Sequence, residues 1–182
     1  MNRRTLIRSA LALPLTAVFG KLALARDRDE IKRMQQEWTA LLDPAFSPPD
    51  PNQALDLSPD EWRDKLSAIA YEVLREEGTE RPFTSELNDE KRPGLFLCAG
   101  CDLPLFSSEM KYDSGTGWPS FFTSIPGAMG TKKDYKLIWP RTEYHCKRCG
   151  GHQGHVFSDG PAPTRERWCN NGVALRFLPA KA

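Results

Sequence analysis

The chain has 182 residues with 25 basic and 24 acidic side chains, a formal net charge of +1, and a hydrophobic share of 40%. This balance excludes the strongly basic face that binding to nucleic acid or to an acidic lipid surface would need. The length suits one globular domain with a terminal arm, and 15 Pro and 13 Gly favour turns and short strands.

The first 25 residues have the pattern of an export signal. "MNRRTLIRSALALPLTAVFGKLALA" has a basic start, an apolar stretch and a small-residue ending before Arg26. The apolar run is too short to span a bilayer, so we expect no membrane span in the mature chain. Arg3 and Arg4, followed by Thr-Leu-Ile, are typical of a twin-arginine signal, and an ordinary Sec leader is the alternative. Either signal places the mature protein outside the bacterial cytoplasm, as in the periplasm.

Residues 26–57 are expected to form an arm before a domain at 58–182. The arm begins with a charged stretch of helical character, "DRDEIKRMQQEWTALL", and continues as the proline-rich "DPAFSPPDPNQALDL", which indicates an extended linker. A helix is then predicted to begin at Ser58 as N-cap, with Pro59 in its first position. Its apolar positions recur at helical spacing up to a closing glycine, and they are Trp62, Leu66, Ile69 and Val73 before Gly78.

Beyond Arg92 the sequence divides into short apolar segments between turns. The segments that we interpret as strands are "GLFLC", "LPLFSS", "YKLIW", "TEYHC", "GHVFS" and "VALRF". The pattern predicts a mainly β fold with a short helical N-terminal prelude.

Four of the five cysteines form two C-x-x-C pairs in glycine-containing turns, Cys98/Cys101 in "CAGC" and Cys146/Cys149 in "CKRCGG". Two such pairs are the usual layout of a four-cysteine structural zinc site, which has no open position for catalysis. One alternative is a disulfide within each pair, which closes a ring too small to add much stability. The other is a redox pair, which needs a thioredoxin-like βαβ setting that the sequence lacks.

Three further stretches hold candidates for chemistry. "GGHQGHVFSDGP" contains His152 and His155, which are reactive imidazoles, metal ligands or core histidines. "SGTGWPSFF" places Trp118 in a tight turn, either as a core indole or against a ligand. Cys169 is either a buried apolar residue or a nucleophile. A free thiol in a compact domain with two histidines favours a thiol–imidazole site.

From about Ser58 to Phe177 the chain resembles the methionine-R-sulfoxide reductases of the B type. The segments that carry the resemblance, in family order, are "EVLREEGTERPF", "LFLCAGCDLPLF", "SGTGWPSFF", "RTEYHCKRCGGHQGHVFSDGP" and "RWCNNGVALRF". The resemblance implies a fold of two antiparallel sheets in which the four paired cysteines hold zinc. It also implies reduction of methionine-R-sulfoxide, chiefly within oxidised proteins, as repair under oxidative stress. We expect the protein to be a monomer.

The resemblance also implies a role for each candidate residue. Cys169 would be the nucleophile, His155 would protonate the sulfoxide oxygen, and His152 would orient substrate and water. Trp118 would contact the methyl group of the substrate. Asn171 would hold the substrate or a histidine through its amide.

The surroundings of the nucleophile include one further implied residue and three departures from the family. Arg167 would lie close to the thiolate and, with the histidines, lower its pKa from about 8.5. Many members have a second, resolving cysteine where this chain has Thr116, so we expect an external thioredoxin-like protein or small thiol to reset Cys169 directly. Asn170 and Gly172 stand where an apolar residue and a serine are usual.

Two functions of other classes fit part of the sequence. A zinc-ribbon binding module would explain the paired cysteines, but it predicts a basic or aromatic-striped face and gives Cys169 no role. A thiol peroxidase or disulfide enzyme would use Cys169, but it should reduce peroxide as fast as sulfoxide.

Overall fold

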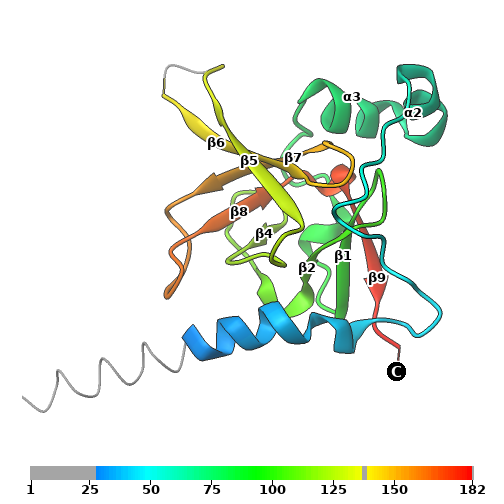
Figure 1. The fold of residues 1–182 in the computed structure, drawn as a ribbon. Coiled ribbons are helices and arrows are strands. Elements are labelled where there is room, and N and C mark those ends of the chain that lie inside the picture. Colours follow the sequence, from blue (N-terminus) through cyan, green and yellow to red (C-terminus); the bar gives the residue numbers. More distant parts are fainter. Residues whose placement is uncertain (1–27, 137–138, 182) are drawn as a thin grey trace, which may run out of the picture.

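The computed structural model describes residues 28–136 and 139–181, which are coloured along the chain in Figure 1. The predicted export signal at 1–25 lies outside these residues. Within the described ranges, no helix is both long enough and apolar enough to cross a bilayer.

The described strands form two antiparallel sheets, which confirms the predicted mainly β fold (Figure 1). The smaller sheet has the order β2-β1-β9, with β1 (Gly94–Cys98), β2 (Pro104–Ser107) and β9 (Leu175–Pro179). The larger sheet has the order β3-β4-β8-β7-β6-β5. Its strands, in chain order, are β3 (Lys111–Tyr112), β4 (Ser120–Phe121), β5 (Met129–Asp134), β6 (Arg141–Cys146), β7 (His152–Phe157) and β8 (Arg167–Asn170).

A cluster of aromatic rings joins the two sheets. Phe106 of the smaller sheet stacks on Phe121 of the larger one with ring centroids 3.9 Å apart, and Phe96 meets Phe121 edge-on at 5.0 Å. Tyr144 and Trp168, both on the larger sheet, meet edge-on at 4.9 Å. Burial of these large apolar surfaces, with the edge-to-face geometry that rings prefer, is the main force holding one sheet against the other.

Most of the predicted strands form, and one prediction is wrong. "GLFLC" is β1, and the other correct segments overlap β2, β6, β7 and β9. In "YKLIW" the described residues Tyr135, Lys136 and Trp139 lie outside any strand. The strand is instead the polar segment before them, β5, which lies at the edge of the larger sheet. An edge strand is solvated and commonly charged, so it shows little apolar pattern.

The single helix predicted at 58–78 is two helices. The helices with defined bounds are η1 (Trp38–Leu41), α2 (Pro59–Lys65), α3 (Ala68–Glu76), η2 (Glu86–Asn88), η3 (Ser108–Met110) and η4 (Gly172–Ala174). Ser58 caps α2 as predicted, in a capping box with Glu61. The break arises because the side chain of Ser67 caps a second helix, α3. As a result Ile69, predicted to face the core, is 42% exposed.

The described part of the arm lies against the sheets. Residues 28–37 are helical and cross the lower side of the view in Figure 1. Gln35 Nε2 donates to Thr123 Oγ1 at 2.7 Å. Further along, the Leu55 N–H donates to the Arg148 carbonyl at 2.8 Å, in the turn of the second cysteine pair. These contacts attach the arm to the domain at both ends, and the boundary at 57 stays a prediction.

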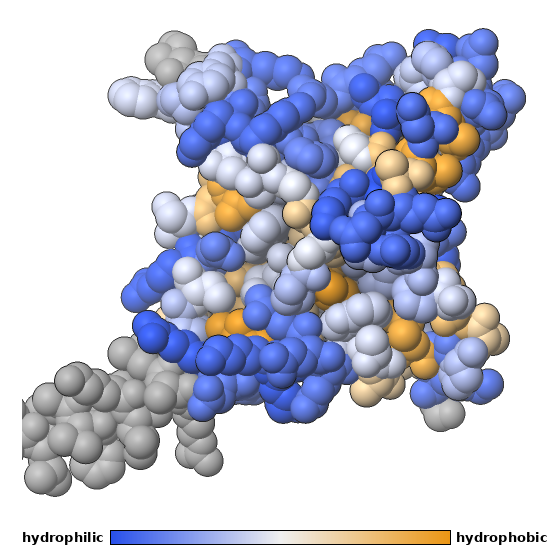
Figure 2. Space-filling model, viewed as in Figure 1, coloured by the Kyte–Doolittle hydropathy of each residue, from blue (hydrophilic) through white to orange (hydrophobic). Residues whose placement is uncertain are grey.

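The face in Figure 2 is mostly hydrophilic, with small and separate hydrophobic areas. The described large apolar side chains that are exposed are Ile69, Phe83, Tyr135 and Trp139. Phe83 is 74% exposed, whereas Phe121 is fully buried. The two phenylalanines therefore form a matched pair for measuring the contribution of the aromatic cluster.

We expect Phe121→Ala to lower the free energy of unfolding by about 3–5 kcal/mol, because it removes the ring that Phe96 and Phe106 both contact and leaves a cavity. Denaturant titration of the purified chain measures the change. Phe83→Ala is the control and should change the free energy by less than about 0.5 kcal/mol. Equal losses in the two variants would contradict the packing described here.

Candidate active site

Cys169 lies in the interior of the larger sheet, on β8. Its ladder partners are Ser120 on β4 and His155 on β7. Because side chains alternate along a strand, Trp168 and Asn170 turn toward the core while Cys169 turns to the opposite face. The thiol is therefore held on rigid backbone and is half-buried.

A cavity of about 230 Å³ opens beside Cys169. Its lining residues are Thr79, Trp118, Arg141, Gly154, His155, Phe157, Cys169, Asn170 and Asn171. Four of the predicted site residues thus meet in one cavity, while His152 and Arg167 lie outside its lining. A larger cavity of about 580 Å³ shares Trp118 but is lined by neither cysteine nor histidine.

His155 is held by a carboxylate on a neighbouring strand. Its Nε2 lies 2.8 Å from Oδ2 of Asp134, and Arg141 donates to the same oxygen at 2.6 Å. The backbone N–H of Lys136 holds the pKa of Asp134 well below its usual range. The ionised Asp134 therefore accepts a hydrogen bond from the Nε2–H of His155. The other ring nitrogen, Nδ1, is left without this partner. Burial lowers the pKa of His155, against the opposing effect of Asp134.

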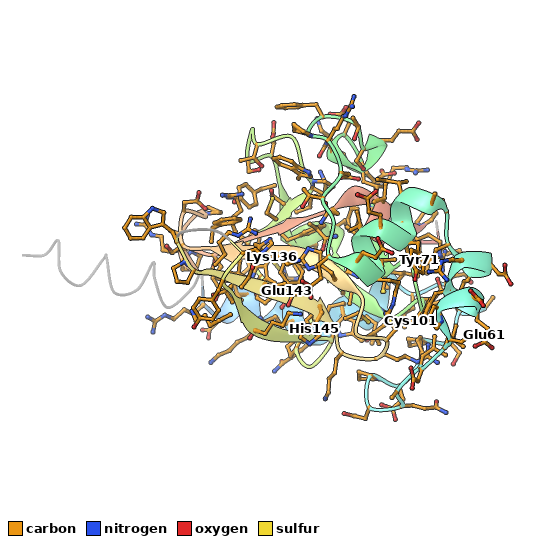
Figure 3. The ribbon with its side chains drawn as sticks, turned by 90° about the horizontal axis from the view of Figure 1, so that it is seen from above. Glu61, Tyr71, Cys101, Lys136, Glu143 and His145 are labelled. Carbon is orange, nitrogen blue, oxygen red and sulfur yellow. The ribbon has the colours of Figure 1, made fainter. Side chains whose placement is uncertain are left out.

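His152 has an equivalent partner in Glu143, whose carboxylate is 2.8 Å from His152 Nδ1. The other oxygen of Glu143 lies 3.2 Å from Nδ1 of His145, and Figure 3 shows these two side chains next to each other. Burial raises the pKa of Glu143, but His145 and His152 outweigh it and lower this pKa to about 2. His152 Nε2 is buried without a hydrogen-bond partner among the described residues. The rings of His152 and His155 are 5.4 Å apart.

Arg167 lies near the thiol, but its charge is shared with an acid. Its guanidinium donates twice to Asp159, at 2.8 Å each, and stacks 4.3 Å from the ring of Phe157. Burial raises the pKa of Cys169 above its ordinary value, while Arg167 and a hydrogen bond from Thr116 oppose the rise. The expected fall in this pKa is therefore wrong for the free protein, because desolvation outweighs a cation that Asp159 partly neutralises.

Asn171 fixes the turn that follows Cys169. Its Oδ1 accepts from the Glu80 N–H at 3.0 Å, and its Nδ2 donates to the Gln153 carbonyl at 3.0 Å. The amide thus binds main chain on two sides, and neither contact is to a histidine. It lines the cavity as a support for the backbone after β8.

Glu80 is a structural residue of the site that the sequence reasoning missed. Its buried carboxylate accepts from the N–H groups of Gly172 at 2.6 Å and Val173 at 2.9 Å, and its carbonyl accepts from Trp118 Nε1 at 3.2 Å. It therefore ties the indole to the turn after β8. Asp134 and Glu143 were missed as well; the available signal was that acids stand in the strand segments that precede the two histidines.

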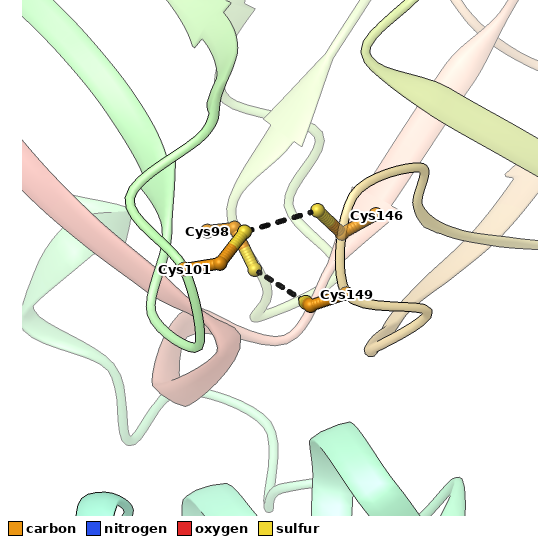
Figure 4. A group of neighbouring side chains, drawn as sticks. All are labelled: Cys98, Cys101, Cys146 and Cys149. Carbon is orange, nitrogen blue, oxygen red and sulfur yellow. Dashed lines mark hydrogen bonds between the residues drawn. The ribbon is translucent and has the colours of Figure 1, made fainter. Parts of the chain in front are cut away.

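The four paired cysteines converge at the turns that follow β1 and β6, as Figure 4 shows. The Sγ atoms of Cys98 and Cys149 are 3.6 Å apart, those of Cys101 and Cys146 are 3.5 Å apart, and all four lie within 4.8 Å of one another. Sulfurs at tetrahedral corners around an ion with bonds of about 2.3 Å would be about 3.8 Å apart. The buried set therefore fits a metal ion. All five cysteines are free, which excludes the alternative of disulfides within each pair in this structure.

Residues 66–179 match the SelR domain family. The chain is 53% identical over 117 residues to the "Peptide methionine sulfoxide reductase MsrB" of Saccharophagus degradans, which covers 64% of this chain and 87% of that protein. It is 49% identical to a protein of the same name from Agrobacterium fabrum, over 65% of this chain and 89% of that one. The identity to another from Pseudomonas putida is 50%, over 70% and 96% of the two chains.

We expect Arg167→Leu to move the alkylation of Cys169 to higher pH, because the substitution removes a buried cation that stabilises the thiolate. Iodoacetamide labelling across a pH series, read by mass spectrometry on the Cys169 peptide, gives the midpoint. Arg176→Leu breaks an exposed pair with Asp102 and should leave the midpoint unchanged. A midpoint that stays or falls in Arg167→Leu would contradict this electrostatic account.

Proposed function

The chain belongs to the SelR-domain family, and from that premise we propose that it reduces methionine-R-sulfoxide, chiefly in oxidised proteins, through thiolate attack by Cys169. The activity of its relatives, peptide-methionine (R)-S-oxide reductase, makes it an oxidoreductase. The observation that carries the proposal is the cavity where Cys169, His155 and Trp118 meet. A thiol, a proton-carrying ring and an apolar wall are what a sulfoxide needs.

The oxygen moves from one sulfur to another. The Cys169 thiolate attacks the sulfoxide sulfur and forms an S–S bond. The oxygen then passes to the Cys169 sulfur as the S–O bond of the substrate and the new S–S bond break, and methionine leaves with its sulfur reduced by two electrons. Cys169 keeps the oxygen as a sulfenic acid, its own sulfur oxidised by two electrons. The step consumes one proton, which must reach the oxygen as the S–O bond weakens.

His155 is the residue that passes this proton to the oxygen. A sulfoxide is a poor electrophile at sulfur until its oxygen is protonated or strongly hydrogen-bonded, and imidazole exchanges protons near neutral pH. Asp134 occupies Nε2 of His155, so Nδ1 is the nitrogen that acts on the substrate. His152 is fixed by Glu143, and its buried Nε2 is available to a water molecule that orients the substrate.

Trp118 reads the chirality of the sulfoxide. Its indole N–H is bonded to the Glu80 carbonyl, so the ring is held in one orientation at the cavity wall. The R epimer places its methyl group against this ring and its oxygen toward His155. The S epimer would direct its oxygen to the indole, where it finds no proton.

The metal that we assign to the four cysteines is zinc. Four thiolates are the typical shell of structural zinc, and the sulfur positions fit a tetrahedral ion. When bound, the ion supplies cross-linking and no open position for chemistry. Metal analysis of the purified chain tests the assignment, and a stoichiometric metal other than zinc would overturn it.

An external thiol resets the enzyme. The remaining four cysteines are held together at the metal site, and Thr116 lies beside the nucleophile with a hydroxyl that cannot form a disulfide. A reductant thiol attacks the sulfenic sulfur of Cys169, water leaves, and a second thiol releases the resulting mixed disulfide. The donor is a thioredoxin-like domain or a small thiol.

The mature chain works outside the cytoplasm after export in folded form. The pair Arg3 and Arg4 supports this proposal, and folding before export would let the four thiolates bind metal while the reducing cytoplasm protects them. Changing both arginines to lysine should block export, as judged by fractionation of cells. Unchanged export would point to the Sec route instead.

The proposed activity is tested by turnover of the two separated epimers of methionine sulfoxide in a peptide. We expect the R epimer to be strongly preferred, and Cys169→Ser to give no measurable turnover because a hydroxyl is a far weaker nucleophile. Peroxide is the control substrate and should be reduced much more slowly than the sulfoxide. A serine variant that keeps its rate, or equal turnover of the epimers, would refute the proposal.

Thr116→Cys tests whether the loop of Thr116 faces Cys169, where the sulfenic acid is reduced. Because Thr116 lies close enough to Cys169 to lower the pKa of its thiol, a cysteine there should form a disulfide with Cys169 after one turnover without reductant. Peptide mapping under non-reducing conditions detects the bond. The control is Thr131→Cys, on the edge strand β5, which should form none. Without a disulfide in Thr116→Cys, the loop of Thr116 does not face the nucleophile.

A further inference from the structure

A chain of buried side-chain hydrogen bonds connects the metal site to the strand that carries the nucleophile. Tyr144 Oη donates to Asn170 Oδ1 at 2.7 Å, and Asn170 Nδ2 donates to Gln153 Oε1 at 3.3 Å. Gln153 Nε2 then donates to the Sγ atom of Cys98 at 3.4 Å. All four residues are 0% exposed, so water cannot replace a lost partner.

We propose that Gln153 is a positioning residue that couples the four-cysteine site to Cys169. The inference rests on the proposed function in one respect, that Cys169 is the nucleophile. No sequence pattern marks Gln153, because its partners are far away along the chain.

The direction of every hydrogen bond in this series is set by the bond at the Cys98 sulfur. A metal-bound thiolate only accepts hydrogen bonds, so Gln153 must present its NH₂ group to Cys98. Its carbonyl oxygen then faces Asn170, which must in turn donate and present its own oxygen to Tyr144. The phenol, whose O–H can donate, closes the series. Every bond agrees with this order, so a metal-bound Cys98 selects one orientation of both amides.

The same glutamine holds the residues that follow the nucleophile. The main-chain oxygen of Gln153 accepts from the N–H of Asn171 at 2.8 Å and from its side chain at 3.0 Å. Asn170, the next residue after Cys169, also donates to the Asn171 carbonyl at 2.8 Å. Gln153 therefore contacts the end of β8 through its main chain and through Asn170, while its side chain also reaches the metal site.

Asn170 stands where an apolar residue is usual in the family that the chain resembles. A buried amide is costly unless its groups are bonded, and here Tyr144 and Gln153 supply the two side-chain partners. The polar residue is thus part of a matched set rather than an isolated departure. Hydrogen bonds to metal-binding groups orient the ligands and tune the site, so the set links metal retention to the geometry of Cys169.

The test uses the zinc-loaded chain. Asn170→Asp keeps the size of the side chain but cannot donate to Gln153, and it does not contact Cys98. We expect zinc transfer to a chromogenic chelator to become about 10-fold faster and kcat for the sulfoxide to fall about 10-fold. KM should stay within about twofold, because the substitution keeps the size of a side chain that is 0% exposed. The control is Thr123→Val, which loses one partly buried hydrogen bond elsewhere and should alter neither rate.

A triple variant separates coupling from stability. This variant replaces the series of hydrogen bonds by apolar groups, through the substitutions Tyr144→Phe, Gln153→Leu and Asn170→Val. Compared with Asn170→Asp, it should restore the melting temperature of the wild type but neither its zinc retention nor its kcat. Recovery of all three would overturn the proposal, as would wild-type zinc transfer in Asn170→Asp. Because zinc transfer is measured without substrate, it tests the coupling even if the wild type reduces no sulfoxide.

Discussion

Four cysteine sulfurs within 4.8 Å of one another hold together two turns that lie far apart in the sequence. One turn follows β1 of the smaller sheet and the other follows β6 of the larger sheet (Figures 1 and 4). A metal ion bound there would cross-link the two sheets at this end, in addition to the aromatic cluster that joins them. Further contacts gather on the second turn: Arg75 donates to the Cys149 carbonyl at 2.8 Å, and the arm reaches Arg148. When ligands meet only in the folded chain, metal binding contributes directly to folding free energy.

The strands next to the four-cysteine site carry the candidate active site. β6 brings Glu143, β7 brings His152 and His155, and β8 brings Cys169. In the free protein burial raises the pKa of Cys169 and lowers the pKa of His155, so both groups are neutral near pH 7. We infer that the thiol itself carries the one proton that the reaction consumes, and that His155 relays it to the sulfoxide oxygen. Rising pH would then favour the thiolate while leaving no proton to transfer, which limits activity on the alkaline side.

The sequence predicted the features that depend on local pattern. The spacing of the cysteines predicted the metal site, and Ser58 predicted the start of α2. The second cap at Ser67 was a local signal too, but the continuous apolar spacing concealed it. What could not be predicted depends on tertiary contacts: the carboxylate partner of each histidine, the use of Asn171 as a backbone support, and the sign of the Cys169 pKa shift. Burial and cross-strand pairing decide these, and neither can be inferred from neighbours in sequence.

The central claim is that Cys169 receives the oxygen of the sulfoxide. The most direct measurement is a single turnover without reductant, using a peptide R-sulfoxide whose oxygen is a heavy isotope, followed at once by intact-protein mass spectrometry and peptide mapping. The account predicts that the protein gains one heavy oxygen and that it resides on Cys169. A protein that gains no oxygen, or that carries the label on another residue while methionine is formed, would contradict it.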